Sequence, residues 1–400
     1  MGNVPNLRFP EFSGEWKETS LSSYAKKITK KNKGNIISNV LCNSANLGII
    51  PQSDYFDRDI ANNENTNTYY VIENGDFVYN PRKSVTAPYG PVNMYLGDKT
   101  GIISPLYLCF SVKDIYCDFL LHWFKGNAWH RYVYSHGDTG VRFDRVSIKD
   151  DIFLNMPIKV PVYEEQIRIS KLLRAIDERI ATQNKIIEDL KKLKSAIMAT
   201  IFGKSNVAKS QWREVKLGNI CERVTRRNSN NMSKLILTIA AQHGLVSQTD
   251  FFNKSVASTD LSNYFLLNKG DFAYNKSYST GYPFGAIKRL DRYDRGVLSS
   301  LYICFSILDG VDSDFLVQYF ETSCWHKEIS MIAVEGARNH GLLNISVSDF
   351  FETYHWIPSY DEQVKIGEFL GKIDEKINKE QEKLDSLNEY KKGLLQKMFV

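Results

Sequence analysis

The sequence contains few cysteines, and their spacing does not suggest a metal site or a disulfide framework. The six cysteines of this 400-residue chain lie far apart, without a C-x-x-C pair. The seven histidines show no H-x-x-x-H or other zinc-ligand spacing. We expect free thiols, with Cys109 and Cys304 buried at matching places in apolar runs, and a reducing, cytoplasmic compartment. Metal ligands are predicted to be absent.

Long apolar runs and a large charge excess are also missing. No run approaches the roughly 18 apolar residues that cross a bilayer, and the opening MGNVPNLRFPEF lacks the regions of a signal peptide. We therefore expect no membrane role. The 51 Lys and Arg residues exceed the 46 Asp and Glu residues by only five, which permits an acidic partner such as nucleic acid without requiring one.

Catalytic motifs are the third absence. No N-P-P-[YF] or D-P-P-Y run for amino-methyl transfer occurs, because Asn80-Pro81-Arg82 stops short of it. The carboxylates in G-D-F strings suit turns, and those in E-E-Q and D-E-Q strings suit helix starts. We predict no catalytic residue in this chain.

What the sequence does contain is a long internal repeat. Trp16 matches Trp212, LYLCFS (106–111) returns as LYICFS (301–306), and the Y-E-E-Q string at 163–166 returns as Y-D-E-Q at 360–363. The repeat length of almost 200 residues is that of a duplicated domain, since solenoid units run to roughly 20–50 residues. Short β-type segments such as TYYVI, DFVYN and LYLCFSV and the helical CDFLLHWF and SDFLVQYF predict an α+β module.

A long heptad helix ends each copy. Apolar residues step by three and four for about four heptads, which predicts a coiled-coil seam. The seam residues are Leu173, Ile176, Ile180, Ile187, Leu190 and Ile197 in one helix and Leu370, Ile373, Ile377, Leu384, Leu387 and Leu394 in the other. Gln183 and Lys194 interrupt the first seam, and Glu380 and Lys391 interrupt the second. The predicted domains are a module at 1–158, a spacer helix at 159–203, a module at 204–356 and a spacer helix at 357–400.

The two helices, each roughly 37 residues and about 55 Å long, could pair with each other or with another molecule. Matching seam lengths favour an intramolecular antiparallel pair. That arrangement would bring Lys194 and Lys391 near acidic residues of the opposite helix and place the modules at opposite ends. The fold class is therefore α+β, with two tandem globular modules separated by two long helices.

Basic residues recur at corresponding places after each tryptophan. This pattern fits phosphate contacts, although a solvated basic face explains it equally well. The residues are Lys27, Lys30 and Lys31 in the first copy and Arg223, Arg226 and Arg227 in the second.

The copies differ most in two stretches each: 81–100 and 134–145 in the first copy, 276–295 and 331–344 in the second. These loops contain side chains that suit base edges, because Arg and Lys match guanine acceptors and Asn matches adenine. The base-readout candidates are Arg82, Lys83 and Arg142, and Lys276, Arg338, Asn339 and His340. A common framework with different loops is what two readers of different short sequences need, whereas loop drift after duplication is the alternative. His130 and His326, each beside a tryptophan, are either DNA contacts or packed helix-end residues, and we favour packing.

The chain resembles the specificity subunits of type I restriction-modification enzymes. The resemblance covers essentially its whole length, through the N-L-R-F-P-E-F-x-G-E-W opening, the G-D-F-x-Y-N and L-Y-x-C-F-S strands and the Y-[ED]-E-Q helix starts in tandem. It implies two target recognition domains that read a split, asymmetric double-stranded DNA target. It further implies that the helices set the gap and dock two modification (methyltransferase) subunits, which restriction subunits with ATP-driven translocation then join. S-adenosylmethionine, ATP and Mg are expected on those partners, with no cofactor in this chain.

Two other function classes remain open. A two-module protein–protein adaptor with a coiled-coil spacer would show no salt-dependent DNA affinity. A DNA-cleaving enzyme would need a metal-binding carboxylate cluster, which the sequence does not suggest.

Overall fold

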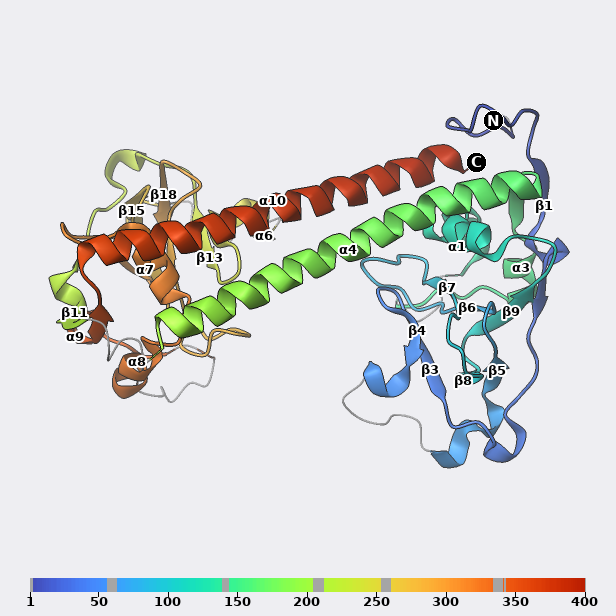
Figure 1. Ribbon diagram of the computed structural model, residues 1–400, viewed down its shortest axis with the longest axis horizontal. Coiled ribbons are helices and arrows are strands. Elements are labelled where there is room, and N and C mark those ends of the chain that lie inside the picture. The colour runs from blue at the N-terminus through green and yellow to red at the C-terminus, as the bar shows by residue number, and fades with distance from the viewer. Residues whose placement is uncertain are drawn as a thin grey trace. The chain divides into compact units, whose positions relative to one another are not determined.

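The structure, a computed structural model, describes residues 3–55, 63–138, 144–203, 212–252, 260–333, 341 and 343–399. Two compact units divide the chain. The first unit comprises Met1–Asn184 with Glu382–Val400, and the second comprises Lys185–Gln381. Each unit therefore combines one globular module with parts of both long helices (Figure 1). In the described residues no helix is long and apolar enough to cross a membrane.

The first module is built on two four-stranded sheets, β2-β9-β6-β7 and β4-β3-β8-β5, and the pair β1-β10. Among the strand pairs described in this module, only β3 and β8 are parallel. The strands are β1 (Lys17–Ser20), β2 (Ala25–Lys27), β3 (Val40–Ser44), β4 (Gly48–Pro51), β5 (Tyr70–Ile72), β6 (Phe77–Tyr79), β7 (Val92–Met94), β8 (Gly101–Ile103), β9 (Leu108–Val112) and β10 (Pro157–Val160). The helices are α1 (Cys117–Lys125), α2 (His130–His136) and α3 (Asp150–Leu154).

The strands of the second module follow one another along the chain in the same order as those of the first. Its four-stranded sheet is β12-β19-β16-β17, with pairs β13-β14, β15-β18 and β11-β20. The strands are β11 (Arg213–Lys216), β12 (Cys221–Arg223), β13 (Leu237–Ala240), β14 (Gly244–Ser247), β15 (Phe265–Asn268), β16 (Phe272–Asn275), β17 (Ala286–Arg289), β18 (Arg295–Leu298), β19 (Ile303–Ile307) and β20 (Tyr354–Ile357). The helices are α6 (Gln248–Phe252), α7 (Ser313–Phe320), α8 (His326–Ile332) and α9 (Val347–Glu352).

Matching sequence strings form matching parts of the two cores. Phe77 pairs with Phe110 across β6 and β9, and their rings stack 5.4 Å apart. Phe272 and Phe305 do the same across β16 and β19, at 5.3 Å. The predicted strands and the predicted short helices are confirmed. All six cysteines are free, and Cys109 and Cys304 are buried as expected.

The long helices are α4 (Tyr163–Ile201) and α10 (Tyr360–Met398), each of 39 residues. Within the first unit the start of α4 lies with the end of α10, and within the second unit the order is reversed, so the two helices of one chain pair antiparallel. The predicted seam side chains are all buried or half-buried along both helices. The fold class is thus confirmed, including the intramolecular coiled coil.

The lysines that interrupt the seam form ion pairs. In the second unit Lys194 Nζ lies 2.6 Å from Asp374 Oδ1, and Gln318 Nε2 donates to Asp374 Oδ2 at 2.8 Å. In the first unit Lys391 forms the corresponding pair with Asp177. The prediction that antiparallel pairing gives these lysines acidic partners is confirmed.

A buried glutamine joins each long helix to its module. Gln166 Oε1 accepts a hydrogen bond from Tyr116 N at 2.8 Å, and Gln166 Nε2 donates to Pro161 O at 2.9 Å. Gln363 makes the same two bonds, with Asp312 N and Pro358 O. These bonds explain the glutamine of the repeated Y-[ED]-E-Q string.

Candidate nucleic-acid interface

In the first module the two divergent stretches meet at one place. Lys83 N donates a hydrogen bond to Asp144 O at 2.8 Å, and the guanidinium of Arg82 lies 3.8 Å from Asp144 Oδ2. Arg82 and Arg145 also form an antiparallel backbone bridge. Segments about sixty residues apart in the chain therefore present their basic side chains together.

The second module brings its own two stretches together in the same way. Leu343 N donates to Lys276 O at 3.0 Å, and Tyr278 N donates to Gly341 O at 2.8 Å. Lys276 Nζ reaches Ile345 O at 3.5 Å. In each module the two variable segments therefore lie together, where their side chains could contact the same stretch of DNA.

Four of the predicted base-reading residues lie outside the described residues, namely Arg142, Arg338, Asn339 and His340. Their assignment stays a prediction. Of the described candidates, Arg82 and Lys83 contact Asp144, and Lys276 contacts Leu343.

The six predicted phosphate contacts have exposed side chains in both modules. Lys27 Nζ lies 2.6 Å from Asp150 Oδ2, and the hydrogen bond between them raises the pKa of Lys27. Lys30 lies 3.8 Å from Glu73, and Arg226 pairs with Asp271. Carboxylates thus reduce the local positive charge at these positions.

The last positions of the two basic clusters lie over aromatic rings. Lys31 Nζ is 5.5 Å from the ring centre of Tyr70, and Arg227 is 4.4 Å from that of Phe265. Cation–π contacts hold these side chains against the module surface. Arg223 is exposed on β12. The phosphate role of all six residues stays a prediction.

His130 and His326 are packed. The His130 ring lies 4.7 Å from that of Tyr89, and His326 lies 5.1 Å from Phe284. Burial lowers the pKa of each imidazole. Packing, which the sequence favoured, is what the structure shows for both residues.

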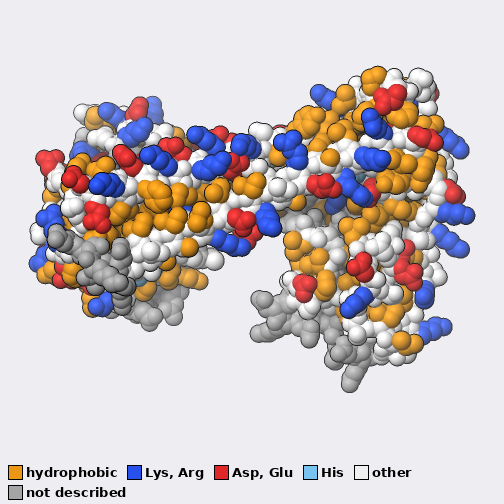
Figure 2. All heavy atoms as spheres, viewed as in Figure 1, with side chains coloured by type: hydrophobic (Ala, Val, Ile, Leu, Met, Phe, Trp, Pro, Cys, Tyr) orange, Lys and Arg blue, Asp and Glu red, His pale blue; other side chains and the backbone are white. Residues whose placement is uncertain are grey.

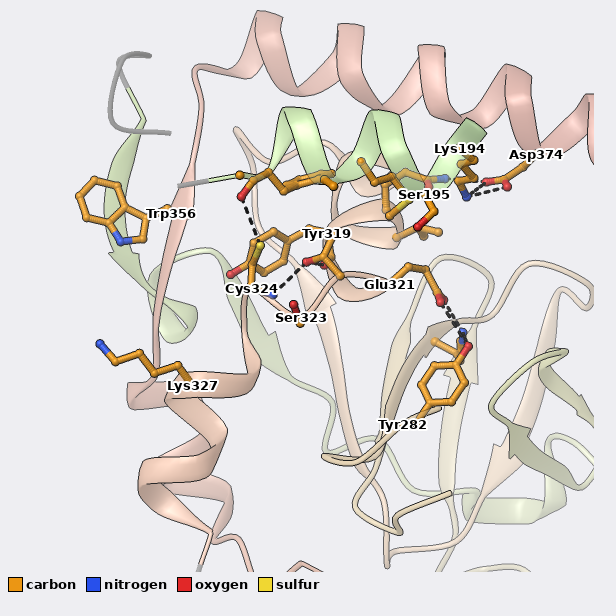
Figure 3. Close-up of a pocket in the computed structure, with 18 of the residues that line it drawn as sticks. Lys194, Ser195, Tyr282, Tyr319, Glu321, Ser323, Cys324, Lys327, Trp356 and Asp374 are labelled. Atoms are coloured by element: carbon orange, nitrogen blue, oxygen red, sulfur yellow. Dashed lines mark hydrogen bonds and ion pairs between the residues drawn. The ribbon is translucent and has the colours of Figure 1, made fainter. Parts of the chain in front are cut away.

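A pocket of about 1370 Å³ lies in the second unit, between α4, α10 and the module (Figure 3). Two ion pairs line the pocket: Lys194 with Asp374, both labelled in Figure 3, and Glu321 with Lys288. Cys324 Sγ donates to Phe202 O at 3.5 Å. Because these charged groups pair with each other, they act as structural ion pairs in this pocket. In the described parts of the chain no group of three His, Cys, Asp or Glu could hold a metal ion.

The surface charge of the long helices is mixed. Basic and acidic side chains lie interspersed along α10 on the face that Figure 2 shows. A single-sign stripe, which would mark a helix that follows a phosphate backbone, is not seen on that face. The convergent loops of the modules are therefore the better candidate for DNA contact.

Some residues of this interface were missed at the sequence level. Asn80 and Asn275, the last residues of the G-D-F-x-Y-N string and its counterpart, cap the divergent turns through their side chains. Arg145, which forms a backbone bridge with Arg82, is the last residue of the divergent stretch 134–145. The signal for the asparagines was present in the repeat, since both copies keep Asn directly before the sequences diverge.

Comparison with known proteins finds similarity to the specificity subunits of type I restriction enzymes. Residues 14–192 match the family of the type I restriction modification DNA specificity domain. The MjaVIII type I restriction enzyme specificity subunit of Methanocaldococcus jannaschii is 24% identical over 338 residues, which are 75% of this chain and 70% of that protein. A putative MjaX specificity subunit of the same organism is 28% identical over 112 residues, 28% of this chain and 25% of that one.

Solved structures share the fold. The type I restriction-modification S subunit of M. genitalium aligns with a TM-score of 0.57 and 15% identity over 99% of each chain. A chain from a study of complex assembly and conformational transition of the type I system aligns with a TM-score of 0.53 and 15% identity, over 97% of this chain and 98% of that chain. The resemblance to the specificity subunits of type I restriction-modification enzymes is thereby confirmed, and it supports a role in DNA sequence specificity.

Proposed function

We propose that this chain is the non-catalytic specificity subunit of a type I restriction-modification complex and reads an asymmetric two-part DNA target. The observation that carries the proposal is that two modules with a common framework have different loop sequences. Both modules have the same order of strands along the chain, and in both the divergent stretches converge. Two readers on one scaffold, with different side chains, predict a target with two different halves.

In this proposal residues 1–158 and 204–356 are the target recognition domains, and 159–203 and 357–400 are the spacer helices. The helices hold a fixed gap between the half-sites and dock two modification (methyltransferase) subunits, which restriction subunits then join. Methyl transfer to a base requires a pocket for a flipped nucleotide, which belongs to the partner. S-adenosylmethionine, ATP and Mg would be bound by those partners.

The test is a genome-wide map of adenine methylation in the host, with and without this gene. Loss of methylation at one split, asymmetric motif supports the proposal. An unchanged map, together with DNA affinity that does not fall as salt rises, would favour the adaptor function. DNA binding weakens with salt because phosphate contacts release counterions.

A further inference from the structure

Corresponding hydrogen bonds hold the turn between β6 and β7 and the turn between β16 and β17. We call residues 81–89 and 276–284 the variable turns; they are equal in length. At the start, Asn80 Oδ1 accepts Arg82 N at 3.0 Å, and Asn275 Oδ1 accepts Ser277 N at 3.0 Å. Side-chain caps of this kind fix a turn without restricting the residues that follow.

The far end of each variable turn is fixed as well. Tyr79 OH donates to Tyr89 O at 2.9 Å, and Tyr274 OH donates to Phe284 O at 2.7 Å. Both tyrosines are buried. Gly90 and Gly285 follow with φ of +85° and +80°, and a Cβ there would lie 2.1 Å from the carbonyl oxygen of Asn80 or Asn275. Only glycine permits the two ends to approach so closely.

The hydrogen bonds inside the variable turns also correspond. Ser84 N donates to Ala87 O at 3.0 Å, and Ala87 N donates back to Ser84 O at 3.2 Å. Ser279 and Tyr282 exchange the corresponding two bonds, at 3.2 and 2.8 Å. The backbone path is therefore common to both modules at these residues.

The two variable turns nevertheless have different side chains, of which Lys83 and Ser277 are half-buried and the other four exposed. Arg82, Lys83 and Val85 of the first module correspond to Ser277, Tyr278 and Thr280 of the second. Val85 is fully exposed and Tyr278 is 62% exposed. A fixed backbone with unlike exposed side chains can change what it contacts without changing the fold.

We propose that the variable turns are the specificity-determining elements of the two modules, with the side chains at positions 82, 83 and 85 and at 277, 278 and 280 contacting base edges. The inference rests on the proposed function. Within the stretches 81–100 and 276–295, it assigns base contact to three positions each. Arg82 and Lys83 suit guanine, and an exposed aliphatic group such as that of Val85 suits the thymine methyl. Tyr278 and Thr280 offer hydroxyl groups instead.

The test transfers these three side chains within the full chain in its host. The variant Arg82→Ser/Lys83→Tyr/Val85→Thr gives the first module the side chains of the second. Thr86 stays, because its counterpart Gly281 has φ of +84°, and Ala87 stays, because its counterpart Tyr282 contacts Lys288 and Glu321. The expected result is a methylation motif altered in one half and unchanged in the other.

A matched control lies in the other part of the same divergent stretch. Leu96 and Lys99 are exposed between β7 and β8, and Leu96→Asp/Lys99→Asp is expected to leave the motif unchanged. A motif altered by this control and not by the turn variant would overturn the inference. An unchanged motif in the turn variant would overturn it too, while the wild-type map still supports the proposed function.

If the triple variant loses all methylation, two further measurements identify the cause. If the triple variant unfolds at the wild-type temperature and still copurifies with the methyltransferase subunits, the loss supports base contact. Failure to copurify would make the turn part of an assembly interface and overturn the inference. The single variant Val85→Thr, at a fully exposed side chain, serves if the triple variant misfolds, and it is expected to relax one motif position. An absent motif in the wild type would instead contradict the proposed function itself.

Discussion

Three buried, hydrogen-bonded polar side chains, centred on His355, distinguish the core of the second module from that of the first. His355 Nδ1 lies 3.0 Å from Tyr319 OH, and His355 Nε2 lies 2.8 Å from Thr353 Oγ1. Because Thr353 Oγ1 donates its only proton to Phe350 O, it accepts from Nε2, which fixes the tautomer with hydrogen on Nε2. The corresponding positions of the first module are apolar and buried: Trp123, Met156 and Ile158.

This arrangement predicts acid sensitivity of the second unit. Burial lowers the pKa of His355 to about 4, below the value of about 6.5 in an unfolded chain. Between pH 4 and pH 6.5 the unfolded state therefore binds more protons than the folded state. The stability that the neutral, buried His355 contributes is complete above pH 6.5 and is lost as the pH falls towards 4. The free energy of unfolding should drop by roughly 3 kcal/mol from this group.

The check is urea unfolding between pH 7 and pH 4 for the variant Tyr319→Phe/Thr353→Met/His355→Ile. It removes all three polar partners, and two of its residues are those of the first module. We expect a shallower pH dependence than in the wild type, with part remaining because His122 is also buried with a pKa of about 4. His243→Gln, at an exposed histidine, is the control, and equal slopes in all three proteins would contradict the prediction.

At the scale of elements, the polar residues of the seam hold each unit's helix pair in register. Lys194 is 15% exposed and contacts Asp374, whose carboxylate also accepts Gln318. Ionic and hydrogen-bonded groups in a seam cost desolvation but oppose sliding by one heptad. The hydrogen bonds thus specify which turn of α4 faces which turn of α10 within the unit.

Lys194→Ala should lower the free energy of unfolding by about 1–2 kcal/mol, because a half-buried carboxylate loses its charged partner. Lys391→Ala should act similarly through Asp177. The matched control is Lys392→Ala, whose side chain is 64% exposed beside Glu389 and should change stability by under about 0.5 kcal/mol. Thermal and urea unfolding measure all three, and equal losses for Lys194 and Lys392 would contradict a register role.

The elements themselves could be predicted from sequence because their signals are local or repeated. The heptad patterns that begin at Leu173 and Leu370 predict both long helices. The repeat supports the strand prediction, because the same strand-like strings occur in both copies. The meeting of Lys83 with Asp144, or of Lys276 with Leu343, could not be predicted, since no local pattern encodes a contact between distant loops. Likewise, Tyr319, Thr353 and His355 are polar residues in core positions, and their mutual hydrogen bonds appear only in the fold.

At the scale of the whole chain, the last residues complete the first module. Trp16 packs against Phe399 with ring centres 6.4 Å apart, and Leu7 N donates to Lys397 O at 2.9 Å. Phe202, the counterpart of Phe399 after α4, packs against Trp212 in the second unit at 5.9 Å. Phe202, just after α4, therefore lies in the core of the second module, and Phe399, just after α10, lies in the core of the first.

Phe399→Ala should destabilise the first unit by about 2–4 kcal/mol, because a buried ring is replaced by a cavity between Trp16 and Phe119. Phe369→Ala, at a side chain 50% exposed on α10, is the control and should cost less than about 1 kcal/mol. Limited proteolysis followed by mass mapping should show faster cleavage in the first module of the Phe399 variant alone. Cleavage of the first module at the wild-type rate in the Phe399 variant would contradict a stabilising role of this side chain.

The proposed spacing role makes a prediction about the length of the helices. Duplicating the heptads 187–193 in α4 and 384–390 in α10 adds about 10.5 Å to each helix while returning the seam to the same face. At about 3.4 Å per base pair, the unread gap of the methylated motif should grow by roughly three base pairs, or methylation should be lost if the DNA cannot follow the rotation. Duplication in α4 alone is the control, because it removes the matched pairing and should abolish methylation. A double variant that methylates the unchanged motif at the wild-type level would show that the helices do not set the gap.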